Sequence, residues 1–159
     1  MPYSETTPLT RIQDFLACKR FAFIGVSRRS NDFSRALFRE FLQRGYDAVP
    51  VHPVATELEG VPCYAHLSDI QPPLDSALLM TSPTLTGDLV QECARAGIQR
   101  IWLYRGAGQG AVTATAIQLC EANGISVIPG ECPFMFFPDT GWIHRAHGFV
   151  KHILGTYPK

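Results

Sequence analysis

Five consecutive residues after an apolar run combine the types that bind phosphate: Gly25, Val26, Ser27, Arg28 and Arg29. A glycine lets the backbone turn sharply and approach a ligand, and hydroxyl and guanidinium groups donate hydrogen bonds to phosphate oxygens. A helix is predicted over residues 31–44, and its first N–H groups and positive dipole end favour an anion. These residues therefore predict a phosphate site at the end of a strand.

The turn differs from the dinucleotide-binding fingerprint. Ser27 and Ser30 stand where that fingerprint has its second and third glycines. An NAD site also has an acidic residue at the end of the second strand, which binds the ribose hydroxyls. This chain has Val51, His52 and Pro53 at that place, so the pattern disfavours NAD.

The remaining candidate binding residues follow the other predicted strands: Thr81, Ser82, Pro83, Gly106 and Cys132. In open parallel sheets, ligands bind outside the carboxyl ends of the strands. These ends contain hydroxyls, prolines and arginines rather than a cluster of acid, base and nucleophile. This composition favours the binding of an extended, phosphorylated ligand over the activation of a bond.

The elements that position these residues alternate along the chain. Strands are predicted over residues 21–26, 47–51, 74–80, 100–104 and 126–129, with helices between most of them and a short helix over 11–19. The helix after Pro83 is expected to bury Leu85, Leu89 and Val90. This alternation predicts an α/β fold, a single doubly wound parallel sheet over residues 11–159 preceded by a loose arm of residues 1–10.

The bulk composition limits the partners. The chain has 159 residues, 46% of them hydrophobic, and its fourteen basic and fourteen acidic residues cancel. A neutral chain gives no electrostatic reason to expect nucleic acid. No apolar run is long enough for a membrane span or a signal peptide, so a cytoplasmic location is expected.

The five cysteines show no spacing typical of a disulfide framework or a zinc ribbon. Cys93 and Cys120 fall on apolar helix faces and are interpreted as core residues. Cys132 stands at a strand end, where a structural thiol is favoured over a nucleophile, because no base is fixed beside it.

Residues 142–155 suit a C-terminal amphipathic helix. This helix either packs on the flank of the sheet or forms the seam of a homodimer. Its three histidines spread over too wide a sector for one tetrahedral metal site, so a solvated polar face is preferred and no metal is expected.

Several short motifs, in this order and spacing, resemble the small CoA-binding domain proteins, which are similar to the nucleotide-binding domain of the succinyl-CoA synthetase α subunit. The motifs are Gly25 with Ser27, Gly45-Tyr46, residues 49–53, Glu59-Gly60, Leu74-Asp75, Ala96-Gly97, residues 101–103 and Cys132-Pro133. The resemblance covers roughly residues 15–138 and implies a Rossmann-like fold that binds coenzyme A.

The resemblance also implies roles for individual residues. Gly25, Ser27, Arg28 and Arg29 would face the phosphates, Val51 and Pro53 would flank the nucleotide, and residues 81–83 would line the path of the adenosine or pantetheine. The family often has Asn-Pro-Lys after the second strand, whereas this chain has His52-Pro53-Val54 and lacks that lysine. The histidine that carries the ligase chemistry lies on a further domain and is not matched here.

The expected function is the binding of coenzyme A or an acyl-CoA by a non-catalytic sensor, carrier or regulatory protein. Two alternatives from other classes stay open. One is an enzyme, either an NAD(P)-dependent oxidoreductase or a thiol enzyme that uses Cys132. The other is a structural or interaction protein whose Rossmann-like fold holds no ligand.

Overall fold

A computed structural model describes residues 7–106 and 108–137 of the chain. Its centre is a five-stranded parallel sheet in the order β2-β1-β5-β6-β7. The strands are β1 Arg20–Ile24, β2 Asp47–Val51, β5 Ser76–Leu79, β6 Arg100–Leu103 and β7 Ser126–Pro129. The parallel α/β sheet confirms the predicted fold class, and the strand order reverses between β1 and β5, the point at which such sheets bind ligands.

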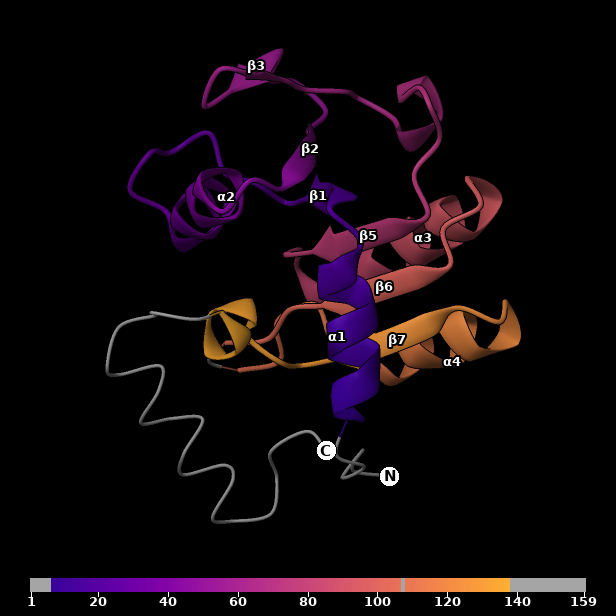
Figure 1. The fold of residues 1–159 in the computed structure, drawn as a ribbon. Coiled ribbons are helices and arrows are strands. Elements are labelled where there is room, and N and C mark those ends of the chain that lie inside the picture. The colour runs from indigo at the N-terminus through magenta and orange to yellow at the C-terminus, as the bar shows by residue number, and fades with distance from the viewer. Residues whose placement is uncertain (1–6, 107, 138–159) are drawn as a thin grey trace.

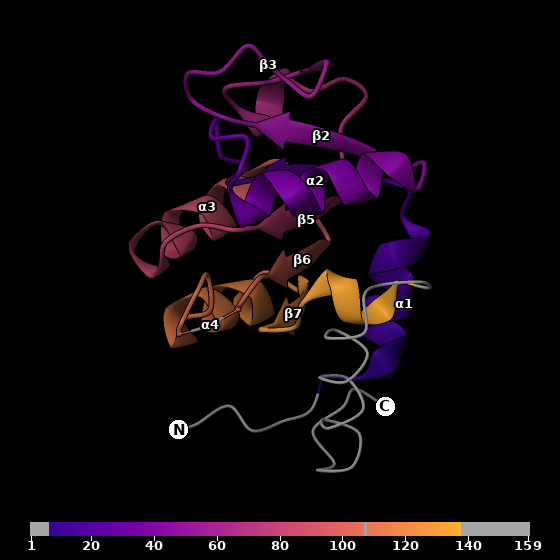
Figure 2. The ribbon, with the colours of Figure 1, turned by 90° about the vertical axis from the view of Figure 1, so that its left-hand side faces the viewer.

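Within the described residues, four helices cover the two faces of the sheet, with α2 on one side and α3 and α4 on the other (Figure 1). They are α1 Leu9–Ala17, α2 Phe33–Gln43, α3 Pro83–Arg95 and α4 Ala114–Ala122. A small antiparallel hairpin, β3 Glu57–Leu58 and β4 Val61–Pro62, follows β2, and 3-10 turns occupy Leu67–Asp69 and Pro133–Phe136. Figure 2 shows α2 lying across the face of the sheet, with β3 beyond the β2 edge.

Alternate residues of β1 supply the cores on the two faces, as the period of a strand requires. Phe21 and Phe23 join an aromatic core with Phe15 of α1 and Phe41 of α2. Ala22 and Ile24 belong to the opposite core, which is aliphatic and includes residues of α3 and α4. Because helices cover both faces of the sheet, the interior residues of each strand are apolar, and polar residues stand at the strand ends.

The helix α3 corrects one predicted burial. Leu85 was expected inside, but it is 54% exposed, whereas Thr86, Val90 and Cys93 are buried. The first turn of α3 buries a hydroxyl instead, because Thr86 Oγ1 donates a hydrogen bond to the Ser82 carbonyl at 3.1 Å. A helical period alone does not show which side of a first turn meets the sheet.

The first helix begins earlier than the sequence predicts. The helix α1 begins at Leu9, inside the stretch expected to be an arm, and Thr7 is buried. Residues 1–6 and the C-terminal helix predicted over 142–155 lie outside the described residues. Cys93 and Cys120 are fully buried, which confirms their interpretation as core residues.

Candidate functional site

A pocket of about 420 Å³ lies where the strand order reverses, at the carboxyl ends of β1, β5 and β6. Four of the predicted binding residues line it: Gly25, Ser27, Thr81 and Gly106. The structure adds residues that the sequence interpretation missed: Asp32, Phe33, Ser34, Met80, Tyr104, Gly110 and Ala111. The pocket therefore has the location that the strand ends predict, with a more apolar and aromatic lining.

Gly25 owes its identity to the close approach of two strands. Its φ is +104°, a conformation that L side chains rarely adopt, and a Cβ there would collide with the carbonyl oxygen of Met80. Met80 also donates its N–H to the Ile24 carbonyl at 2.8 Å, which joins the ends of β1 and β5. The glycine that was predicted to admit a ligand thus also lets β5 close against β1.

The start of α2 is capped by a carboxylate of the chain itself. Asp32 Oδ1 accepts hydrogen bonds from the Ser34 N–H at 2.9 Å and the Ser34 hydroxyl at 2.6 Å. Ser34 Oγ in turn accepts the N–H of Ser27 at 2.9 Å. The hydrogen bonds from Ser34 and the charge of Arg29 lower the pKa of Asp32, so its negative charge persists at the helix end.

The negative charge of this cap disfavours an anion at the N-terminus of α2. The sequence predicts phosphate at the α2 N-terminus, but Asp32 already satisfies that end and would repel a phosphate placed on it. Positive side chains belong instead to the turn before the helix, at Arg28 and Arg29. An Asp two residues before a Ser at a helix start is a common capping pattern, so sequence reasoning could have found it.

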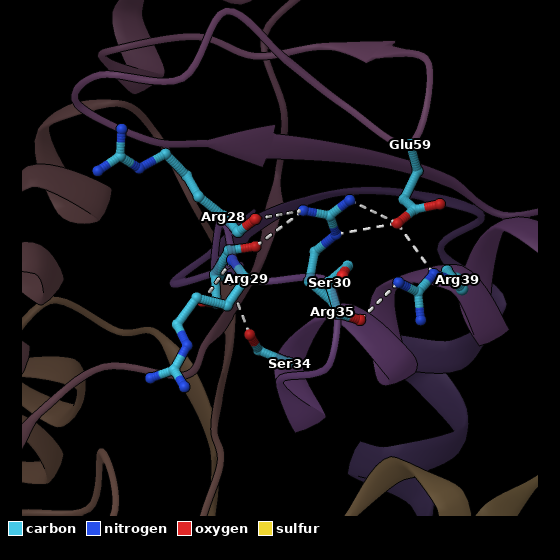
Figure 3. Close-up of polar contacts among 8 residues, drawn as sticks. Arg28, Arg29, Ser30, Ser34, Arg35, Arg39 and Glu59 are labelled. Carbon is cyan, nitrogen blue, oxygen red and sulfur yellow. Dashed lines mark hydrogen bonds and ion pairs between the residues drawn. The ribbon is translucent and has the colours of Figure 1, made fainter.

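Arg28 and Arg29 extend in different directions from the turn, as Figure 3 shows. Arg29 lies near Asp32, whose pKa its charge lowers, and its N–H donates to Ser27 Oγ at 3.1 Å. Arg28 lies near His52, whose pKa is lowered by burial and then by the charge of Arg28. One turn therefore presents two cations toward two places, the start of α2 and the end of β2.

Two backbone N–H groups that follow His52 in the chain fix the tautomer of its neutral ring. Its Nδ1 accepts hydrogen bonds from the N–H groups of Val54 and Ala55, at 3.0 and 2.9 Å. Protonation of Nδ1 would break both, so the neutral ring carries its proton on Nε2. His52 therefore offers one N–H donor at the end of β2, beside Arg28.

Two predicted residues present little of their side chains to a ligand. Val26 is 1% exposed and Val51 is 8% exposed, and each belongs to a core cluster. Pro53 is exposed in the turn after β2. Val26 and Val51 would therefore meet a ligand through their backbone.

The end of β5 places hydroxyls beside the pocket. Thr81 Oγ1 and Thr86 Oγ1 lie 3.3 Å apart, and because the Thr86 hydroxyl donates to Ser82, Thr81 is the donor of this pair. The Thr81 oxygen keeps its acceptor capacity for a ligand. Ser82 and Pro83 are exposed at the start of α3 and do not line the pocket.

Aromatic side chains form one wall of the pocket. Phe33 stacks on Tyr104, with ring centroids 5.7 Å apart, and meets Phe134 at 5.6 Å. Burial and then the nearby charge of Cys132 raise the pKa of Tyr104 to about 12, so its hydroxyl remains a hydrogen-bond donor at neutral pH. Cys132 lies near Tyr104, at the start of the 3-10 turn Pro133–Phe136, but outside the pocket lining.

The described part of the chain contains neither a metal-binding cluster nor a membrane-spanning helix. Residues 7–106 and 108–137 contain no group of three or more His, Cys, Asp or Glu side chains that could hold a metal ion. No helix among them is long and apolar enough to cross a bilayer.

A family model described as a CoA binding domain matches residues 19–138. The match covers most of the chain, and the protein belongs to the CoA-binding domain family, as its motifs indicate. It is 27% identical to the uncharacterized protein YneT of Bacillus subtilis (strain 168) over 114 residues, which cover 72% of this chain and 82% of YneT.

Solved structures share the fold. A hypothetical protein from Pyrococcus horikoshii OT3 has a TM-score of 0.74 at 22% identity, over 84% of this chain and 91% of that one. A dinucleotide forming acetyl-coenzyme A synthetase from Ca. Korarchaeum cryptofilum, solved with phosphate and ADP, matches with a TM-score of 0.62 at 20% identity. That match covers 70% of this chain but only 25% of the synthetase, so the chain corresponds to a part of that enzyme.

Proposed function

We propose that the protein binds coenzyme A, free or acylated, as a non-catalytic carrier or sensor. The observation that carries the proposal is the pair of cations on one turn, Arg28 and Arg29, beside the pocket where the strand order reverses. Coenzyme A has two groups of negative charge, a diphosphate and a ribose 3′-phosphate. Two guanidinium groups that reach different places suit such a ligand better than one with a single phosphate group.

The nucleotide half would lie over the ends of β1 and β2. In this arrangement Arg29 and the turn at residues 27–30 bind the diphosphate, while Arg28 and His52 Nε2 bind the 3′-phosphate. Arg28 then supplies the charge that the absent lysine after β2 supplies in related proteins. The electrostatic effect of Arg28 on His52, at the end of β2, supports this arrangement.

The pantetheine half would enter the pocket. Its two amides need donors and acceptors, and its methyl groups need apolar surface. Thr81 Oγ1 has acceptor capacity, the Tyr104 hydroxyl is a donor, and Phe33 adds an aromatic surface that is 40% exposed. These chemical types match pantetheine better than they match a second nucleotide.

The titratable groups at the pocket support a binding role without catalysis. Asp32 is engaged in capping α2, and Tyr104 remains protonated at neutral pH. Neither has the pKa near neutrality that a general acid or base needs.

Native mass spectrometry of freshly purified protein tests the proposal directly. We expect an adduct with the mass of coenzyme A or an acyl-CoA, removed by dialysis and restored by added coenzyme A. An adduct with the mass of NAD, which added coenzyme A fails to displace, would contradict it.

A further inference from the structure

We infer that Glu59, Arg35 and Arg39 are positioning residues that hold the backbone of residues 27–30 in its ligand-binding shape. This set of three side chains is called the Glu59 brace below. The brace itself does not touch the ligand. Its proposed effect on affinity rests on the proposed function, whereas its effect on the backbone of the turn does not.

One carboxylate oxygen joins the two arginines of α2. Glu59 Oε1 accepts hydrogen bonds from Arg35 Nε at 3.0 Å, Arg35 Nη2 at 2.6 Å and Arg39 Nε at 2.9 Å (Figure 3). These bonds, led by those from Arg35, lower the pKa of Glu59. Because the carboxylate is fixed by three donors, both guanidinium planes are fixed in turn.

The same two guanidinium groups bind the carbonyls of the turn. Arg35 Nη1 donates to the carbonyls of Ser27 and Arg28, both at 3.2 Å. Arg39 Nη2 donates to the carbonyl of Ser30 at 2.6 Å. Three of the four carbonyls at residues 27–30 are therefore directed toward α2 by side chains that Glu59 holds.

The direction of these carbonyls decides where the N–H groups of the turn point. In a trans peptide the C=O and the following N–H point in opposite directions. The carbonyls of Ser27 and Ser30 face the brace, so the N–H groups of Arg28 and Asn31 point away from it. That is the side on which we place the diphosphate, and outward N–H groups are what an anion-binding turn needs.

Glu59 stands at a turn position whose backbone conformation favours residues other than glutamate. It forms with Gly60 the two-residue turn between β3 and β4, and their φ values are +53° and +76°. Such a turn favours asparagine, aspartate or glycine at both places. The Glu59 side chain is long enough to meet both Arg35 and Arg39, so the choice of residue fits the brace rather than the turn.

The substitution Glu59→Asn separates the two roles. Asparagine suits the turn but removes both the charge and the reach of the side chain, so the hairpin is retained and the brace is lost. Glu59→Gln is a second variant that keeps the length and removes only the charge. Glu40→Gln is the matched control, because Glu40 lies on α2, is 26% exposed against 23% for Glu59, and pairs with Arg44 at 2.6 Å away from the turn.

The experiment measures amide hydrogen exchange without ligand, and coenzyme A affinity by calorimetry, for the four proteins. We expect exchange to be about tenfold faster in Glu59→Asn at Ser27 and Arg29, whose N–H groups donate to Ser34 Oγ and Ser27 Oγ. Coenzyme A should bind about tenfold more weakly, with smaller effects in Glu59→Gln. Glu40→Gln should match the wild type in both. Exchange in the middle of α2 should be unchanged in all variants.

The outcomes separate this inference from the proposed function. Unchanged exchange at the Ser27 and Arg29 amides in Glu59→Asn overturns the brace, whatever the ligand. Faster exchange with unchanged coenzyme A affinity overturns its role in binding. A wild-type protein that binds no coenzyme A overturns the proposed function, while the exchange measurement still decides whether the brace holds the turn.

Discussion

His52, at the end of β2, is electrostatically coupled to Arg28, in the turn after β1: burial lowers the pKa of the His52 imidazole, and the positive charge of Arg28 lowers it further. The charge of a residue in the first turn is thus felt at the end of the second strand. Arg29, the next residue along the chain, instead lies near Asp32. The two arginines therefore carry their charges toward different groups.

Replacing each arginine separately tests this division. Arg28→Ala should weaken coenzyme A about tenfold and dephospho-CoA much less, because only the 3′-phosphate meets Arg28. Arg29→Ala should weaken both ligands equally, since both carry the diphosphate. Calorimetry with the two ligands measures this difference, and an equal loss for both ligands in Arg28→Ala would show that Arg28 does not bind the 3′-phosphate.

Removing the charge of Asp32 should strengthen binding. Asparagine caps a helix as well as aspartate does, so Asp32→Asn should leave the free energy of unfolding nearly unchanged. Loss of a negative charge beside the diphosphate should tighten coenzyme A binding about threefold to fivefold at low salt. Weaker binding in titrations of this variant would mean that Asp32 accepts a hydrogen bond from the ligand.

The identity of Gly25 should matter for folding before it matters for binding. Gly25→Ala combines an unfavourable φ with a collision against the Met80 carbonyl, so we expect a loss of about 2–5 kcal/mol in urea denaturation. Gly45→Ala is the control, because its φ is +81° but no atom lies within 4 Å of the added Cβ. That variant should lose only about 1 kcal/mol, and equal losses would contradict the role of the Met80 contact.

The protonation of His52 should appear in the pH dependence of stability. Its pKa is lowered in the folded protein from the ordinary 6.5, so the unfolded chain binds more protons as the pH falls. The stabilisation from neutral His52 is therefore present above pH 6.5 and is lost as the pH falls through the folded pKa. His52→Asn keeps an acceptor for the backbone N–H groups and should lack this part of the decline in denaturation at pH 7.5 and pH 5.

Much of the fold follows from local patterns in the sequence. The ranges predicted for β2 and β7 are those observed, because glycines and a change of period mark their ends. The helix predicted from residue 31 begins two residues later, at Phe33, because Asp32 caps the helix and is not part of it. Leu85 was misplaced because its burial depends on how α3 meets the sheet.

Less of the candidate site than of the fold could be predicted from local sequence patterns. The strand ends were predicted, and these bring Gly25, Ser27 and Thr81 to one pocket. The aromatic wall joins Phe33 with Tyr104 and Phe134, which are far apart in the chain and have no shared motif. The Glu59 brace depends in the same way on the β3–β4 hairpin meeting α2, a contact that no local pattern contains.

Calorimetric titration of the purified, ligand-free protein with coenzyme A, NAD and ADP tests the central claim most directly. If the turn at residues 27–30 and the adjoining pocket bind the whole of coenzyme A, it should bind at least tenfold more tightly than ADP, which lacks pantetheine, and than NAD, which lacks the 3′-phosphate. Absent coenzyme A binding, or affinities equal for the three ligands, would contradict the account.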